Sequence, residues 1–282
     1  MRMAPRKYQV AIPSFQRAEG IAKKTLPFLL NGGVDPARIT IYLHDNDPQL
    51  EQYQALAEQH GVTVKATAMR GITPQRTFIT NDYPEGTPLV CIDDDVTDVM
   101  EALDAKTLRP VQDVDGLFTM MFRETAARDL YLWGLAPVIN AFYMKPGRIS
   151  EGLKFLIFSL FGCYVRPGHP VNEFTVPYKD EHEMSLRAWW WDGAVVRHDG
   201  MSAKANFYTD PGGCQAETST KRTPEKVAYS VAELQRQWPG LVRINDRKKD
   251  TGYVEITLTP KKRHGGHPVT TPPPGDRAKA AA

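Results

Sequence analysis

The chain of 282 residues has only three cysteines, Cys91, Cys163 and Cys214, and they are far apart in the sequence. An odd number of scattered cysteines argues against a disulfide framework and against a zinc site built from paired cysteine motifs. Such sparse use of cysteine is typical of a reducing compartment, so we expect a cytoplasmic location.

Long apolar runs are also missing. No stretch approaches the roughly 20 apolar residues that a membrane-spanning helix needs, and no apolar signal core follows the basic residues 1–7. Hydrophobic residues make up 41% of the chain and charged residues 24%, both ordinary values for a globular protein with a substantial core. We therefore expect no membrane partner.

A broad excess of positive charge is absent from most of the chain. The formal net charge is +2, but residues 261–282 hold five Lys and Arg against one Asp, a net +4, which leaves −2 for residues 1–260. Any contact with nucleic acid must therefore come from local patches or from the tail. The Gly-, Pro- and Ala-rich composition of residues 261–282 predicts a disordered basic tail.

Two common nucleotide-binding motifs are absent as well. The sequence contains no Gly-x-Gly-x-x-Gly and no Gly-Lys-Ser/Thr phosphate-binding loop. Neither a dinucleotide-binding unit nor a P-loop is therefore supported.

The first ~95 residues alternate between short β-rich runs and helical segments, a pattern typical of parallel crossovers. Strands are expected at residues 8–12, 39–43, 62–66 and 88–92, and helices near Ala18, Pro48 and Thr73, with Pro27 bending or breaking the first helix. The pattern predicts an α/β fold with an open, mostly parallel sheet flanked by helices.

The second half has a looser, mixed pattern. Asp113 is expected to cap a helix whose apolar stripe begins at Val114. Further strands are expected at residues 130–135, 155–161, 162–165, 194–198 and 253–258, and helices from Asp180 and over 227–238. Residues 203–223, rich in Gly, Thr and Lys, are expected to form a loop or a lid.

Three consecutive aspartates, Asp93, Asp94 and Asp95, follow the apolar run 88–92. Adjacent carboxylates repel one another unless a cation or a hydrogen-bond network compensates them. Hard oxygen ligands at the carboxyl end of an α/β strand favour Mg²⁺ or Mn²⁺ together with a phosphate. The alternative is a solvated acidic turn in which Asp95 caps a short helix.

The ends of the four predicted strands should lie side by side at one edge of the sheet, where open α/β sheets bind ligands. Their residue types suit a nucleoside diphosphate. Asp45 can accept hydrogen bonds from a base or ribose, and Arg17 and Arg76 can neutralise phosphates.

Several motifs together resemble the GT-A glycosyltransferases. They are Ile-Pro-Ser-Phe-Gln-Arg-Ala at 12–18, Ile-Tyr-Leu-His-Asp at 41–45 and Val-Cys-Ile-Asp-Asp-Asp-Val at 90–96. Gln16 stands where that family often has Asn. Together with Tyr-Lys-Asp-Glu-His-Glu-Met-Ser-Leu-Arg-Ala-Trp-Trp at 178–190, the chain resembles the TET-associated DNA glycosyltransferases of bacteriophages.

The resemblance covers most of residues 8–258 and implies one GT-A domain over 1–260. Its nucleotide-sugar half would be 1–100, and its mixed-strand acceptor half 101–260. It implies a nucleotide sugar, expected to be a UDP-sugar, with Mn²⁺ or Mg²⁺ as cofactor. It further implies inverting transfer onto 5-hydroxymethylcytosine in phage DNA, in the host cytoplasm if a phage encodes the chain.

The resemblance also implies roles for individual residues. Donor binding falls to Pro13, Ser14, Arg17, Asp45, Arg76, Asp93 and Asp94; metal binding to Asp95, with Asp93 and His198 as further ligands; and general-base catalysis to Asp180, with Glu181 as the alternative. A strand-edge role for His198 and a capping box of Asp180 with Glu183 are equally open.

Consecutive tryptophans close the helix that begins at Asp180. Because they cannot all face one core, Trp190 or Trp191 is a candidate to stack on the acceptor, although core packing is the simpler role.

Other functions are also compatible with these motifs. A GT-A enzyme acting on a protein or glycan would share them, and so would a nucleotide-binding pseudoenzyme. A two-metal nuclease needs more clustered carboxylates than residues 93–95 provide.

Overall fold

The computed structural model describes residues 7–205, 212–213, 216, 221–246 and 252–275. Its main sheet has eight strands in the order β3-β2-β1-β4-β9-β7-β10-β8. These are β1 (Gln9–Pro13), β2 (Ile39–His44), β3 (Thr63–Thr67), β4 (Pro88–Ile92), β7 (Leu132–Leu135), β8 (Ile149–Gly152), β9 (Leu160–Tyr164) and β10 (Val195–His198). Only β8 and β9 run against the other six, which confirms a mostly parallel α/β sheet.

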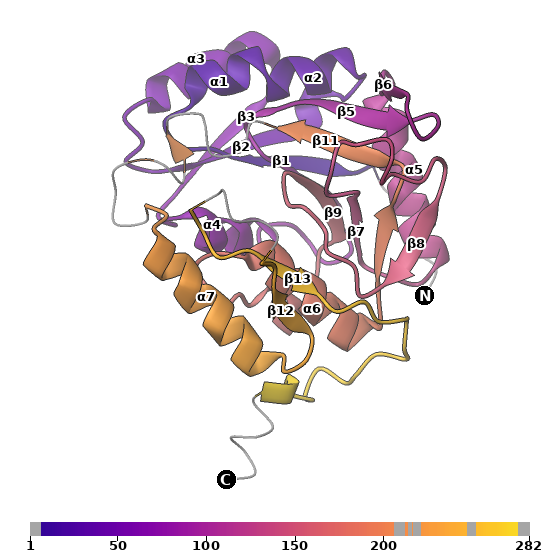
Figure 1. The fold of residues 1–282 in the computed structure, drawn as a ribbon. Coiled ribbons are helices and arrows are strands. Elements are labelled where there is room, and N and C mark those ends of the chain that lie inside the picture. The colour runs from indigo at the N-terminus through magenta and orange to yellow at the C-terminus, as the bar shows by residue number, and fades with distance from the viewer. Residues whose placement is uncertain (1–6, 206–211, 214–215, 217–220, 247–251, 276–282) are drawn as a thin grey trace.

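Helices cover both faces of this sheet (Figure 1). They are α1 (Ala18–Lys23), α2 (Thr25–Asn31), α3 (Leu50–His60), α4 (Ile72–Ile79), α5 (Val114–Ala127), α6 (Asp180–Asp192) and α7 (Pro224–Gln237), with 3₁₀ turns η1 (Pro36–Arg38) and η2 (Pro170–Asn172). Helices α1, α2 and α3 lie together on one side, and α4, α6 and α7 on the other. The first helical segment breaks at Lys24 rather than at Pro27. Pro27 lies in the first turn of α2, where a backbone N–H has no partner within the helix.

Alternation along the strands divides the core between the two faces. In β4, Val90 and Ile92 pack with α1, α2 and α5, whereas Leu89 and Cys91 pack with residues of α4 and α6. Because both faces are covered, the strand is apolar throughout, which is why the run 88–92 predicts a buried strand.

A second, antiparallel sheet begins immediately after the aspartates. It contains β5 (Val96–Ala102), β6 (Leu108–Pro110) and β11 (Met201–Ala205) in the order β11-β5-β6. The Thr25 hydroxyl donates to the carbonyls of Asp93 at 2.8 Å and Val96 at 3.1 Å and so holds the turn before β5. The alternative in which Asp95 caps a helix is therefore wrong, because a strand follows it.

The strand predicted at 155–161 is wrong over most of its length. Residues 154–159 have no regular structure, and β9 begins only at Leu160. The rings of Phe158 and Phe161 stack with centroids 4.0 Å apart, so this apolar run is buried by ring packing rather than by strand pairing.

Part of the predicted disordered tail is ordered. The carbonyl of Lys261 accepts from the Leu153 amide at 2.9 Å, and that of Lys262 accepts from the Trp189 indole at 3.0 Å. Residues 261–275 thus cover the tryptophans of α6, whose apolar surface supplies the contacts that composition alone does not reveal. Residues 276–282 lie outside the described part of the chain.

A third core joins α6 and α7 to a two-stranded ribbon of β12 (Val242–Ile244) and β13 (Ile256–Leu258). Within the described ranges, no helix has the length and apolar character to cross a bilayer.

Candidate functional site

A cavity of about 830 Å³ opens at the carboxyl ends of β1, β2 and β4 and extends to the start of α6. Nine residues that the sequence assigned to function line it: Pro13, Ser14, Arg17, Arg76, Asp93, Asp94, Asp95, Asp180 and Glu181. Residues from four separate elements therefore meet in one place, as the strand-end pattern predicts.

Asp94 is enclosed by the loop that follows β1. Its carboxylate accepts from the Ser14 hydroxyl at 2.6 Å and from Arg17 Nη1 at 2.9 Å. Burial raises the pKa of Asp94, and the Arg17 charge and the Ser14 hydrogen bond act against that rise. Arg17 therefore serves first as the counter-charge of Asp94.

Hydrogen bonds to α3 and to the turn before it hold the loop that carries Arg17. The Gln16 amide donates to Asp47 Oδ2 at 2.8 Å, and the Arg17 amide donates to the Tyr53 hydroxyl at 2.8 Å. Gln16 adopts a left-handed backbone with φ 56°. These bonds satisfy amides at the start of α1 and hold a conformation that a non-glycine residue adopts at some cost.

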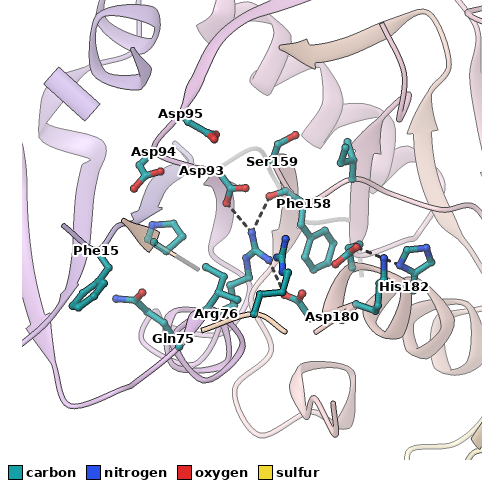
Figure 2. Close-up of a pocket in the computed structure, with 18 of the residues that line it drawn as sticks. Phe15, Gln75, Arg76, Asp93, Asp94, Asp95, Phe158, Ser159, Asp180 and His182 are labelled. Carbon is teal, nitrogen blue, oxygen red and sulfur yellow. Dashed lines mark hydrogen bonds and ion pairs between the residues drawn. The ribbon is translucent and has the colours of Figure 1, made fainter. Parts of the chain in front are cut away.

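Arg76 connects the aspartate turn to α6 (Figure 2). Its Nη2 donates to Asp93 Oδ1 at 2.7 Å, and its Nη1 donates to Asp180 Oδ2 at 2.7 Å. Nη2 also donates to the carbonyl of Phe158 at 3.2 Å. The planar guanidinium is the side chain best suited to bridge two carboxylates, and here it is buried between them. Arg76 thus forms ion pairs with two carboxylates, whereas the sequence predicted that it neutralises phosphates.

Arg76→Met is expected to lower the free energy of unfolding by about 3–5 kcal/mol, because it leaves the buried Asp180 carboxylate without a counter-charge. Urea denaturation followed by circular dichroism measures this loss. Adding Asp180→Asn to Arg76→Met removes the stranded charge, so the double variant should recover part of the stability. A loss below about 1 kcal/mol for Arg76→Met alone would contradict the bridging role.

Asp95 is the least compensated of the three aspartates. Arg17 Nη1 lies 4.0 Å from its Oδ2, farther than the 2.9 Å between Arg17 and Asp94 or the 2.7 Å between Arg76 and Asp93. Burial and the neighbouring Asp93 and Asp94 charges raise the pKa of Asp95 from 3.8 to about 7. A buried carboxylate in a negative field is a position that a divalent cation would stabilise.

The donor set fits a metal that is shared with a phosphate ligand. No group of three His, Cys, Asp or Glu side chains in the described chain is arranged to hold a metal alone. Mg²⁺ and Mn²⁺ sites with nucleotides commonly use one or two carboxylates and complete their shell with phosphate and water oxygens. Asp95 and Asp93 suit that arrangement.

The first turn of α6 brings further titratable groups to the cavity. Asp180 is buried, and burial together with Glu181 raises its pKa despite the adjacent Arg76. Burial also acts to raise the pKa of Glu181, but His182 and Lys179 outweigh it and the net shift is downward. The His182 ring stacks on Phe155 at 4.2 Å. Two adjacent carboxyls of different basicity therefore face the cavity.

The turn into α6 differs from a capping box. Lys179, in a left-handed backbone with φ 66°, stands at the N-cap, and its Nζ donates to Glu255 at 2.9 Å. Glu183 instead accepts from the Thr175 amide and from Arg187. The capping box of Asp180 with Glu183 is therefore wrong, because Glu183 is committed to the segment before the helix.

His198 does not line the cavity. It ends β10, which is separated from β4 by β9 and β7, so about 14 Å of sheet lies between them. Its Nδ1 accepts from the Gly200 amide at 3.2 Å. The structure thus gives His198 a strand-end role, in contrast to the metal ligation that the resemblance implied.

Asp45 is also outside the cavity lining, although its neighbours His44 and Asn46 are part of it. Its carboxylate is half exposed and lies 3.2 Å from His44 Nδ1. Asp45 therefore lies at the rim, where the predicted contact with a base or ribose stays a prediction.

Trp190 and Trp191 are packed away from the cavity. Both belong to the core between α6 and α7. The Trp190 ring stacks on His267 at 3.8 Å, and its indole N–H donates to the carbonyl of Thr271 at 3.3 Å. The acceptor-stacking role for these two residues is not supported, because residues 261–275 occupy the surface that an acceptor would need.

Several cavity residues were not identified from the sequence. Ser159 accepts from the Asp93 amide at 3.0 Å through its carbonyl, and the Phe158 ring lies 5.3 Å from the Arg76 guanidinium carbon. Both come from the run misread as a strand, and a backbone carbonyl leaves no trace in the sequence. For His182, its position beside two carboxylates at a helix start was an available signal.

The predicted loop or lid at 203–223 is described only in part. The Gly213 amide donates to the Phe15 carbonyl at 2.8 Å, and Gly213 and Arg222 line the cavity. Residues 206–211, 214–215 and 217–220 lie outside the described part of the chain.

No protein-family model matches the sequence, and no curated protein matches it. Among solved structures, the chain is similar to the mannosyltransferase PcManGT from Pyrobaculum calidifontis in complex with GDP-Man and Mn²⁺. Identity is 10% and the TM-score is 0.47, over 70% of this chain and 58% of that one. S. aureus TarS (residues 1–349) gives 8% identity and a TM-score of 0.48 over 82% of this chain and 66% of that one.

The chain is also similar to glucosyl-3-phosphoglycerate synthase from Mycobacterium tuberculosis in complex with Mn²⁺, UDP and glucosyl-3-phosphoglycerate. Identity is 11% and the TM-score is 0.47, over 97% of this chain and 92% of that one. The chain spans less than two thirds of the length of the mannosyltransferase and of TarS. At these identities, and with TM-scores below 0.5, the likeness transfers no activity, substrate or cofactor to this chain.

Proposed function

We propose that this protein is a metal-dependent, inverting glycosyltransferase that uses a nucleoside-diphosphate sugar, expected to be a UDP-sugar. The observation that carries the proposal is that Asp93, Asp95 and Asp180 line one cavity, in which Arg76 pairs with both Asp93 and Asp180. A cavity of about 830 Å³ has the size range of sites that enclose small ligands.

Donor binding is assigned to the strand-end side of the cavity. Ser14 and Arg17 hold Asp94 in place, and Asp93 is oriented by Arg76. Asp95, with Asp93, would hold the cation against the diphosphate oxygens of the donor. When bound, the cation would stabilise the charge that develops on the departing diphosphate.

Acceptor activation is assigned to Asp180. Its carboxylate accepts the proton of the acceptor hydroxyl as that oxygen forms its bond to the anomeric carbon. The bond from this carbon to the diphosphate oxygen breaks at the same time, and attack from the far side inverts the configuration. The raised pKa makes Asp180 a stronger base than an ordinary carboxylate, and Arg76 fixes its orientation. Glu181 is the alternative base.

For the acceptor we propose 5-hydroxymethylcytosine in DNA, on the strength of the motif at 178–190 and its resemblance to the phage enzymes. A protein or glycan acceptor would use the same donor chemistry, so an experiment must test the acceptor as well as the donor.

Mass spectrometry of nucleosides tests donor and acceptor together. DNA containing 5-hydroxymethylcytosine is incubated with the protein, Mn²⁺ or Mg²⁺ and a panel of nucleotide sugars, and then digested. We expect a hexose or pentose mass on the hydroxymethylated nucleoside only, with unmodified cytosine in the same DNA as the internal control. Transfer to a protein or glycan but not to this DNA would overturn the proposed acceptor, and no transfer from any donor to DNA, protein or glycan would overturn the assignment as a glycosyltransferase.

A further inference from the structure

An exposed aromatic pair lies on a loop that also forms part of the cavity wall. After β7, Pro137 and Val138 line the cavity, and the chain then turns outward to Phe142 and Tyr143, each 68% exposed. Their rings meet edge to face with centroids 5.1 Å apart. Two adjacent aromatic side chains this exposed are unusual unless they bind something.

The loop holds the pair in a defined position. The Phe142 amide donates to Asn140 Oδ1 at 3.0 Å, and the Tyr143 amide donates to the Asn140 carbonyl at 3.0 Å. Met144, the next residue, is buried with Ala102 and Ala136. The two rings are therefore presented by an anchored turn.

Basic side chains lie where this loop ends, at the point where the Lys145 amide donates to the Asp199 carbonyl at 2.9 Å. Arg148 and Arg197 both contact Asp199, at 3.3 Å and 2.7 Å, and Arg197 Nη1 donates to the carbonyl of the cavity residue Phe155 at 3.3 Å. Lys154 directly precedes Phe155 in the chain, and burial together with the charges of Arg197 and Arg148 lowers the pKa of Lys154.

The sheet register puts these charges on one face. Arg197 pairs with Ser150 across β10 and β8, and Arg148 lies two residues before Ser150. Glu151 therefore points to the opposite face, where its carboxylate contacts Arg128 at 3.8 Å and Arg263 at 3.4 Å. Arg148 and Arg197 share the single carboxylate of Asp199, and Lys154 adds a further cation, so positive charges outnumber negative ones in this set although residues 1–260 carry a net negative charge.

We propose that Phe142, Tyr143, Arg148, Lys154 and Arg197, here called the aromatic–basic surface, bind a single-stranded segment of nucleic acid beside the cavity. The inference rests on the proposed function, in which a nucleobase enters that cavity. Cations match the phosphates, and exposed rings match unstacked base faces, which a duplex keeps covered. An aromatic surface without the cations would suit a protein equally well, and the charge decides for nucleic acid.

Fluorescence anisotropy with labelled oligonucleotides tests the surface on the full-length protein. A single strand of about 12 nucleotides, long enough for one such groove, is compared with the same sequence as a duplex. The double variant Phe142→Ala with Tyr143→Ala should weaken single-strand binding at least about tenfold, from the loss of base stacking. Tyr229→Ala removes an aromatic ring on α7 that is 61% exposed and serves as the matched control with unchanged binding.

Charge is tested through salt dependence. Arg148→Gln should weaken binding and lower the slope of log affinity against log salt by about one phosphate contact. Arg109→Gln, which removes an exposed arginine on β6, is the control with an unchanged slope.

Calorimetry of UDP with Mn²⁺ separates this proposal from the proposed function, because the double variant should bind UDP as the unmodified protein does. Equal oligonucleotide affinity of the double variant and the unmodified protein, or tighter binding of duplex than of single strand, would overturn the aromatic–basic surface while donor binding stands. Loss of oligonucleotide binding in the double variant, in a protein that binds no UDP, would support the surface and overturn the donor site.

Discussion

Asp95→Asn is expected to reduce sugar transfer by about a thousandfold or more, while the fold is retained. Asparagine has the shape of aspartate but lacks the charge that would hold a divalent cation against the donor diphosphate. Loss of this charge stabilisation is worth several kcal/mol in the transition state. Transfer measured by mass spectrometry at saturating nucleotide sugar, with Mn²⁺ titrated, gives the size of the loss.

The same substitution is expected to stabilise the fold, because burial and the neighbouring carboxylates make the ionised form of Asp95 unfavourable. Its pKa is raised from 3.8 to about 7, so the folded protein binds more protons than the unfolded chain over this range. The contribution of Asp95 to the free energy of unfolding therefore falls as the pH rises from about 4 to about 7, and it is constant above pH 7. The gain from Asn should grow over that window, and thermal unfolding at pH 5 and pH 8 measures it.

Asp98→Asn is the matched control, since Asp98 lies on β5 just after the turn and its side chain is 37% exposed. It should change neither transfer nor the pH dependence of stability. Full activity of Asp95→Asn with Mn²⁺ present would remove the metal site from this turn.

The sequence predicted the half of the fold that depends on local pattern. Strands β1 to β4 and the helices between them are marked by apolar runs and turn residues, because each strand is buried on both faces. The meeting of the aspartates with Ser14 and Arg17 follows from parallel topology alone. Asp180 was placed at the site only through the resemblance. It lies 104 positions after Arg76 in the sequence, and no rule of spacing predicts a contact over that separation.

The errors have a common physical cause, because each concerns which distant residues a side chain lies beside, and the local sequence pattern does not reveal this. Trp190 and Trp191 were candidates for acceptor stacking because one helix face cannot bury consecutive tryptophans, but residues 261–275 supply a second face. Likewise, His198 lies at a strand end as predicted, but the strand order separates it from the aspartates. The order of the strands, and the packing of residues 261–275 on α6, depend on contacts between distant parts of the chain that the sequence pattern does not show.

Asp180→Asn is expected to lower the rate of transfer about 10²- to 10⁴-fold, the range associated with loss of a general base. Asparagine keeps an oxygen that can accept from Arg76 Nη1, so donor binding should be largely retained. Calorimetry of UDP with Mn²⁺ checks this, and single-turnover kinetics measures the chemical step. In the unmodified protein, the rate of transfer should fall on the acidic side at a pH above the usual carboxyl pKa, because burial raises the pKa of Asp180.

Glu181→Gln is the matched control one residue along the same helix. The pKa of Glu181 is held low by His182 and Lys179, which makes it the weaker base of the pair, and its removal should cost about tenfold or less. Both variants replace a carboxylate by an amide in the lining of one cavity, so the difference between them reports basicity and position rather than charge alone. A larger loss in Glu181→Gln than in Asp180→Asn would assign the base to Glu181 and leave Asp180 as the anchor of Arg76.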